Sequence, residues 1–163
     1  MIIDGRAVVI PGDNVDTDVM YPGEFLNIED PEQMKLYLFE GFDPTLRDQL
    51  GDDSVLVTGA NFGLGSSREH VVQALREWGV RCVIGKSFAR VFRRNCVNLG
   101  LPVLECPEAS ELVEPGSHIR IDTDAGRVEV DGHVFQAQPV PSFVLEVHAA
   151  GGLVPWARER VAE

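Results

Sequence analysis

Residues 61–70, Asn-Phe-Gly-Leu-Gly-Ser-Ser-Arg-Glu-His, bring together side chains that suit a small anion. Glycines let a ligand approach the backbone, and the N–H groups at the start of a helix point toward negative charge. Arg68 adds a planar guanidinium that matches a carboxylate. The hydroxyls of Ser66 and Ser67 could exchange a proton with a bound acid where the site stabilises the anionic serine.

Two other interpretations of this segment remain open on residue types alone. Ser66 to Glu69 match the S-x-x-E capping box, with Ser66 as N-cap and Glu69 reaching back to its N–H. A nucleotide-phosphate site is disfavoured, because the segment lacks the G-x-x-x-x-G-K-[ST] spacing and matches G-x-G-x-x-G poorly. The residue types in this segment do not decide between a helix cap and a carboxylate site.

Aspartates, histidines and cysteines elsewhere show no metal-site spacing. The loop after the first strand carries Asp13, Asp16 and Asp18 without the glycine and glutamate of an EF-hand, and such aspartates ordinarily form turns, cap helices or face solvent. The cysteines lack a C-x-x-C pair, so we expect buried free thiols at Cys82, Cys96 and Cys106. No ligand spacing is present among His70, His118, His133 and His148.

Alternating strands and helices must position the glycine–serine segment. Residues 54–60 predict a strand before it, and 67–78 predict a helix after it, whose apolar face is Val71, Ala74, Leu75 and Trp78. Further strands at 80–85 and 101–106 flank a predicted helix at 87–99. This β-α-β-α-β run predicts neighbouring parallel strands with right-handed crossovers.

The segments outside this run complete one α/β domain over 1–163. We expect a first strand at 6–11 and a short helix at 32–41. The alternation in 118–124 and 127–137, with Asp131-Gly132 between two apolar runs, predicts an added antiparallel hairpin. A closing helix is expected to stop at Gly151-Gly152.

Charge and hydropathy exclude several classes of function. The net charge of −12 repels nucleic acid and anionic membranes, so neither is expected as a partner. No apolar run approaches the ~20 residues that span a bilayer, and the N-terminus lacks a signal-peptide pattern, which favours a cytoplasmic protein. The basic residues Lys86, Arg90, Arg93 and Arg94 are expected to have a structural or subunit-contact role.

Three stretches carry a family resemblance. GANFGLGSSREH, KSFARVFRRNCVNLGLPVL and GDNVDTDVMYPG resemble the small subunits of 3-isopropylmalate dehydratase and the swivelling domain of aconitase-type hydro-lyases. The resemblance implies a swivelling β/β/α domain and a reversible dehydration–rehydration of a malate-type acid. It also implies a [4Fe-4S] cluster in a partner large subunit, acting as Lewis acid on the hydroxyl. Without that subunit this chain is expected to be inactive.

The resemblance also assigns roles to individual residues. Ser66 matches the catalytic base, and Ser67 and Arg68 match the residues that hold a substrate carboxylate. Because Ser66 cannot both cap the helix and face the substrate, Ser67 or the backbone alone is expected to cap. Asp16, Thr17 and Asp18 are second-rank candidates that orient arginines or the loop.

A loop at about 19–31 is expected to select the substrate. Relatives that bind a third carboxylate carry an arginine there, whereas this chain has Phe25, Leu26, Asn27 and Ile28, with Asn27 at the arginine position. Aliphatic side chains favour isopropylmalate over tricarboxylic acids, although Phe25 and Leu26 could equally be packing residues. The alternatives are homoaconitase, a citramalate or dimethylmalate dehydratase, and a non-enzymatic small-anion-binding or interaction module.

Overall fold

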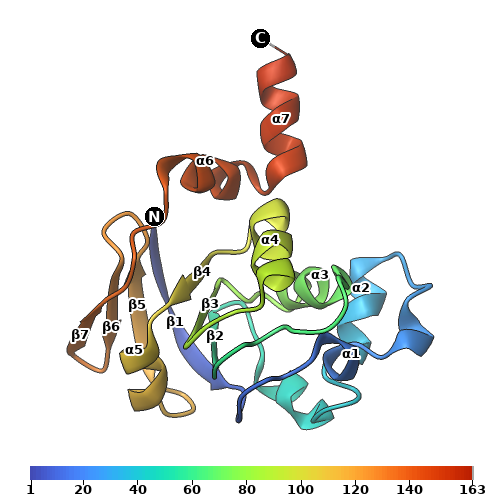
Figure 1. Cartoon of the computed structure of the whole chain (residues 1–163), viewed down its shortest axis with the longest axis horizontal. Helices are drawn as coiled ribbons and strands as arrows, with labels where there is room; N and C mark the ends of the chain where they lie inside the picture. Colours follow the sequence, from blue (N-terminus) through green and yellow to red (C-terminus); the bar gives the residue numbers. More distant parts are fainter. Residues whose placement is uncertain (163) are drawn as a thin grey trace.

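A seven-stranded mixed sheet runs through residues 1–162, which the computed structural model describes (Figure 1). The strand order is β4-β3-β2-β1-β5-β6-β7. Neighbours from β1 to β4 pair in parallel, and β1, β5, β6 and β7 pair antiparallel. The strands are β1 (Ile2–Val9), β2 (Ser54–Thr58), β3 (Cys82–Gly85), β4 (Val103–Glu105), β5 (His118–Asp122), β6 (Arg127–Val130) and β7 (His133–Gln136).

The inner parallel strands are apolar because both of their faces are covered. Every residue of β2 and β3 is buried, and successive side chains point to opposite faces of the sheet. Leu56 and Val83 enter the core that α2, α3 and α4 cover, whereas Val55 and Ile84 enter a second core on the other face. The second core is closed by α5 and by the inward residues of β5 and β6.

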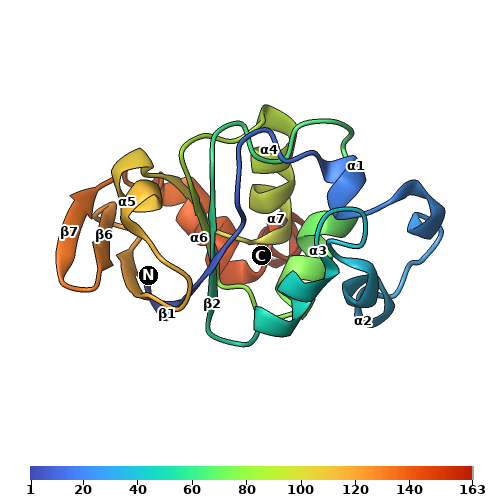
Figure 2. The ribbon, with the colours of Figure 1, turned by 90° about the horizontal axis from the view of Figure 1, so that it is seen from below.

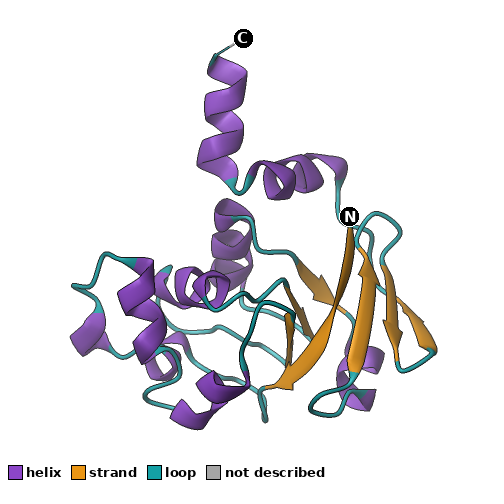
Figure 3. Cartoon of the chain, turned by 180° about the vertical axis from the view of Figure 1, so that it is seen from behind, coloured by secondary structure: helices purple, strands orange, loops and turns teal. Residues whose placement is uncertain are grey.

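Helices and 3-10 turns fill the connections and the C-terminal part. The helices are α1 (Thr17–Met20), α2 (Pro31–Met34), α3 (His70–Glu77), α4 (Arg90–Leu99), α5 (Pro107–Leu112), α6 (Ser142–Ala150) and α7 (Leu153–Val161). The 3-10 turns are η1 (Gly23–Phe25), η2 (Lys35–Tyr37) and η3 (Pro44–Gln49). Seen from below, α1 and α2 lie at the opposite end of the molecule from β6 and β7 (Figure 2). The last helix, α7, projects away from the body (Figure 3).

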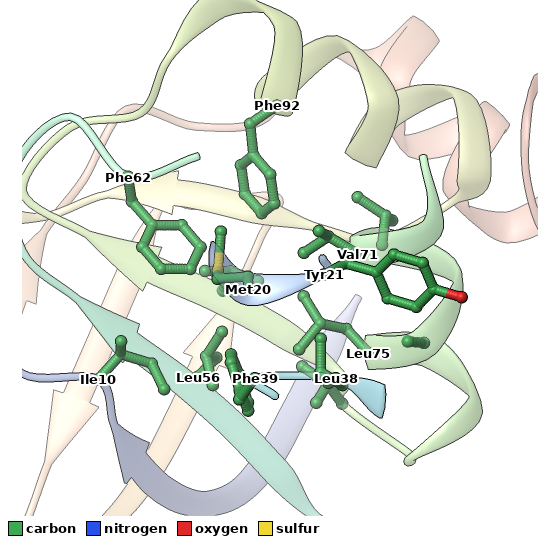
Figure 4. Close-up of a cluster of buried hydrophobic side chains, with 14 of the residues drawn as sticks. Ile10, Met20, Tyr21, Leu38, Phe39, Leu56, Phe62, Val71, Leu75 and Phe92 are labelled. Carbon is green, nitrogen blue, oxygen red and sulfur yellow. The ribbon is translucent and has the colours of Figure 1, made fainter. Parts of the chain in front are cut away.

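The long connection between β1 and β2 is anchored in the larger core. Met20 and Tyr21, at the end of α1, are fully buried and lie beside Val71 and Leu75 of α3 (Figure 4). Phe62 from the glycine segment meets Phe92 of α4 edge to face, with ring centroids 5.1 Å apart. Each such buried side chain contributes roughly 1.5–3 kcal/mol of transfer free energy, which fixes both loops relative to the helices.

The predicted β-α-β-α-β unit and the hairpin are confirmed. Strands β2, β3 and β4 pair in parallel, and α3 and α4 connect them, as expected. Asp131 and Gly132 both have positive φ, 46° and 87°, as the tight turn between β6 and β7 requires. No helix in residues 1–162 is long and apolar enough to cross a membrane.

Several predicted boundaries were wrong. The helix predicted at 67–78 begins only at His70, and the helix predicted at 87–99 begins at Arg90. The expected helix at 32–41 is four residues of α2 followed by the turn η2, and the first strand begins at Ile2 rather than at residue 6.

The Gly151-Gly152 pair both ends and begins a helix. Gly151 closes α6 in the left-handed conformation, as predicted, with φ of 88°. Gly152 then takes φ of 133° and redirects the chain, so that α7 begins at the next residue. This second helix was not predicted, because the glycine pair was interpreted only as a stop.

Candidate active site

Two loops meet at the carboxyl ends of the neighbouring parallel strands β1 and β2. The backbone N–H of Thr17 donates to the Leu64 carbonyl at 2.9 Å, and that of Gly63 donates to the Val15 carbonyl at 2.9 Å. Loops that follow adjacent parallel strands leave at the same edge of the sheet, which is where ligands bind in many α/β folds. The aspartate loop and the glycine–serine segment therefore form one surface.

Gly65 allows this close approach. Its φ is +102°, and a Cβ at this position would lie 2.5 Å from Oδ1 of Asp16. The same Asp16 carboxylate accepts a hydrogen bond from the Asp18 backbone N–H at 2.6 Å and caps α1. A side chain at residue 65 would therefore displace the group that orients Asp18.

We expect Gly65→Ala to destabilise the chain by roughly 1–3 kcal/mol more than Gly116→Ala, because the two variants share backbone strain but only the first creates a clash. Gly116 has φ of +85° and nothing within 4 Å of its added Cβ. Urea denaturation of each purified variant measures the difference. Equal free energies of unfolding would show that the Asp16 contact places no constraint on residue 65.

Ser66 is held by hydrogen bonds to the aspartate loop rather than to the helix. Its Oγ donates to Oδ1 of Asp18 at 2.7 Å, and its carbonyl accepts from the buried Thr17 hydroxyl at 3.0 Å. The Ser66 hydrogen bond, assisted by the positive charge of Arg68, lowers the pKa of the Asp18 carboxyl. Ser66 itself is exposed, so its hydroxyl is accessible to a ligand.

The capping-box interpretation is wrong. The residue before α3 is Glu69, which has helical backbone angles, and no side chain caps the first turn. Ser67 therefore does not cap either, and the start of α3 is left to its backbone. The physical reason is competition: the Asp18 carboxylate takes the Ser66 hydroxyl as a charge-assisted donor, which is a stronger bond than a neutral cap.

Arg68 is fixed by the same loop. Its Nε lies 3.3 Å from Oδ1 of Asp18, and its Nη1 donates to the Tyr21 carbonyl at 2.8 Å. Only 19% of the side chain is exposed. These contacts leave Nη2 without a hydrogen bond within residues 1–162, so the guanidinium keeps free N–H groups for a carboxylate.

An open hollow of about 400 Å³ lies over these residues. It brings together the predicted serines, the arginine and one residue of the predicted substrate loop, and it is lined by Leu26, Ser66, Ser67, Arg68, Glu69 and His70. Glu69 and His70 were not predicted as site residues. Their position directly after the Ser-Ser-Arg run was the available signal.

The predicted substrate loop divides between packing and exposure. Phe25 stacks on Tyr37 with centroids 4.1 Å apart, and Ile28 packs against the larger core. Leu26 is 37% exposed and faces the hollow, and Asn27 is exposed. His70 holds this loop, because its Nε2 lies 3.1 Å from the Leu26 carbonyl.

The cysteines of the chain do not fit an iron–sulfur cluster. Cys96 lies in the core on one face of the sheet, whereas Cys82 and Cys106 lie in the core on the other face. All three are free and buried, as predicted, and burial raises the pKa of Cys82 to about 12. Within residues 1–162, no group of three or more His, Cys, Asp or Glu side chains is placed to hold a metal ion.

The basic residues on and before α4 are not among the residues that line the hollow. Lys86 pairs with Glu111 at 3.5 Å, and Arg93 pairs with Glu105 at 2.5 Å. Arg90 and Arg94 are exposed. Their placement agrees with a surface or contact role.

Comparison with known proteins gives consistent similarities. The Aconitase C-terminal domain family matches residues 45–109. The 3-isopropylmalate dehydratase small subunit of Caldanaerobacter subterraneus subsp. tengcongensis is 42% identical over 161 residues, covering 98% of this chain and 99% of the relative. The 2,3-dimethylmalate dehydratase small subunit of Eubacterium barkeri is 45% identical over 145 residues, covering 88% and 89%.

A solved structure extends the similarity to the whole fold. The crystal structure of 3-isopropylmalate dehydratase from Methanocaldococcus jannaschii superposes with a TM-score of 0.91 at 35% identity, covering 99% of this chain and 96% of that one. The predicted fold class, an aconitase-type α/β domain with a parallel core and an added antiparallel part, is confirmed by this similarity.

Proposed function

The chain belongs to the family of 3-isopropylmalate dehydratase small subunits, and from that premise we propose that it is one half of a hydro-lyase that interconverts 2-isopropylmalate and 3-isopropylmalate. The observation that carries the proposal is the contact of Ser66 and Arg68 with one carboxylate, that of Asp18, at the edge of the hollow. A base, a cation and a group that orients both are then adjacent.

In this proposal Ser66 moves the proton and Arg68 holds the acid. The Ser66 oxygen takes the proton from the carbon next to a substrate carboxylate, and that carboxylate binds the free N–H groups of Arg68, with Ser67 beside it. Asp18 positions the Ser66 hydroxyl at 2.7 Å and can accept its proton as the carbon-bound proton arrives. A substrate carboxylate bound to Arg68 shares the positive charge of that arginine. The charge then stabilises the Asp18 carboxylate less, so Asp18 accepts a proton more readily.

The partner in this proposal is a large subunit that carries the [4Fe-4S] cluster. The cluster would supply a Lewis acid for the departing hydroxyl, and the cysteines of this chain, which lie in two separate cores, do not provide its ligands. The open hollow at Ser66 would then face the cluster only in the assembly. Because one continuous sheet runs through the chain, we expect the chain to move as one swivelling domain over the large subunit.

The residues around the hollow favour an aliphatic substrate. Leu26 offers an apolar side chain beside Ser66, and Asn27 provides no guanidinium for a third carboxylate. A third carboxylate without such a partner would lose a charge-assisted hydrogen bond that stabilises by roughly 1.5–3 kcal/mol. The dimethylmalate dehydratase relative makes 2,3-dimethylmalate the second candidate substrate.

Reconstitution with an iron–sulfur large subunit of 3-isopropylmalate dehydratase tests the proposal. We expect no turnover by this chain alone, and in the assembly a higher kcat/KM for 2-isopropylmalate than for 2,3-dimethylmalate, homocitrate or citrate. A preference for 2,3-dimethylmalate would move the assignment to the second candidate. An assembly that forms but turns over none of these acids would favour the non-enzymatic alternative.

A further inference from the structure

A second cavity lies between α4, the edge strand β4 and α6, away from the candidate active site. Its volume is about 320 Å³, within the size range of small-molecule pockets. It shares no lining residue with the hollow at Ser66. Figure 1 shows α6 above and to the left of α4, joined to β7 by the segment that leads up to it.

The walls of this cavity are largely aliphatic, and no Phe, Tyr or Trp is among the residues that line it. The aliphatic residues come from α4, β4, α6 and the chain after β7, and they include Val97, Val103, Pro139, Val140, Pro141 and Val144. Such a surface offers branched, non-planar shapes that match a branched aliphatic group better than a flat ring. Burial of the apolar part of a ligand against these walls would stabilise the complex.

His148 is a buried polar group within these walls. The residue is 7% exposed, and neither Nδ1 nor Nε2 has a hydrogen-bond partner among residues 1–162. Burial lowers the pKa of the His148 imidazole to about 4, so the ring is neutral at pH 7 and offers one donor and one acceptor. Both ring nitrogens are inaccessible, so the ring contributes its carbon atoms to the cavity wall.

One ion pair borders the same cavity. Arg93 and Glu105 line it, and their Nη2 and Oε1 atoms are 2.5 Å apart. Both side chains are a little under half exposed, so they remain accessible from solvent. Arg93 has further N–H groups for a carboxylate, and Glu105 can accept from an ammonium group.

We propose that this cavity binds a small carboxylic acid with a branched aliphatic chain and a hydroxyl or amino group on the carbon next to the carboxylate. The carboxylate lies at Arg93, the branched chain packs on Val97 and Val144, and the hydroxyl or ammonium group donates to Glu105. The site is separate from Ser66, so the proposal does not depend on the proposed function.

Isothermal titration of the full chain with 2-hydroxy-4-methylpentanoate, L-leucine and acetate tests this. We expect saturable binding of at least one branched acid, with acetate roughly tenfold or more weaker because it lacks the apolar chain. Preference for L-leucine would indicate an ammonium contact with Glu105, and preference for the hydroxy acid would indicate a hydroxyl contact with it. Binding should also shift the NMR signals of the His148 ring.

Variants locate the binding. Val144→Trp fills the cavity and Arg93→Gln removes its cation, and each should weaken binding roughly tenfold or more. His148→Phe is a second filling variant if Val144→Trp does not fold. Val134→Trp, at an exposed site on β7, is the matched control and should bind as the parent does. Absence of saturable binding at millimolar concentrations, or equal binding by Val144→Trp and Val134→Trp, would overturn the proposal.

Discussion

Ser66→Ala should lower kcat of the assembled enzyme by roughly 10²- to 10⁴-fold, which is the usual contribution of a general base. The methyl group cannot accept the carbon-bound proton, and the Asp18 carboxylate loses its 2.7 Å donor. Because Ser66 is exposed and its backbone contacts with Thr17 do not involve the side chain, the fold should be kept. Steady-state assays of the reconstituted enzyme measure the change.

Two comparisons make the Ser66 result interpretable. Ser142→Ala, at the exposed start of α6 where no side chain caps the helix, should leave kcat unchanged. Circular dichroism and co-elution with the large subunit should be the same for both variants. Turnover by Ser66→Ala within a few fold of the parent would remove Ser66 from the proton-transfer role.

Arg68→Lys should lower kcat/KM by roughly 10- to 100-fold, although the positive charge remains. Lysine has no planar fork, so it cannot hold the Tyr21 carbonyl, Asp18 and a substrate carboxylate at once. Without the guanidinium, the Asp18 carboxylate would also compete with the substrate carboxylate for the single ammonium group of the lysine. Kinetics over a range of 2-isopropylmalate concentrations separate the KM effect from the kcat effect.

An arginine outside the site provides the control for Arg68. Arg127 lies on β6 with its side chain 54% exposed and an ion-pair partner, Glu129, at 3.6 Å. Arg127→Lys should therefore leave kcat/KM unchanged. If Arg68→Lys behaves in the same way, charge alone is sufficient and the proposed bidentate contact with the carboxylate is wrong.

The parallel core was predictable because its signals are local. Apolar runs at β2 and β3 need cover on both faces, and the glycines after the helices mark their ends within a residue. The start of α3 was not predictable in this way. The Ser66 hydroxyl could bond either to the backbone N–H three residues further along, as a helix cap, or to the Asp18 carboxylate 48 residues earlier. Only the folded chain brings Asp18 within reach.

The candidate site was predicted in part for the same reason. The hollow unites Ser66, Ser67 and Arg68, which are neighbours in sequence, with Leu26, which the long loop delivers. Phe25 and Ile28 look as apolar as Leu26 in the sequence, yet packing against Tyr37 and the core turns them inward. His148 gave no local signal, because its neighbours in the second cavity come from α4, β4 and the segment after β7.

The central position of β1 has a consequence for how the chain folds. This strand pairs with β2 on one side and with β5 on the other, so Ile2 lies opposite Asp122. During synthesis, β1 emerges first but its second neighbour, β5, emerges only after β4, and pairing across such a long separation is slow. A nascent or truncated chain that stops after β4 would present β1 as an unprotected edge, which is a template for aggregation. The antiparallel part of the sheet therefore protects the parallel part.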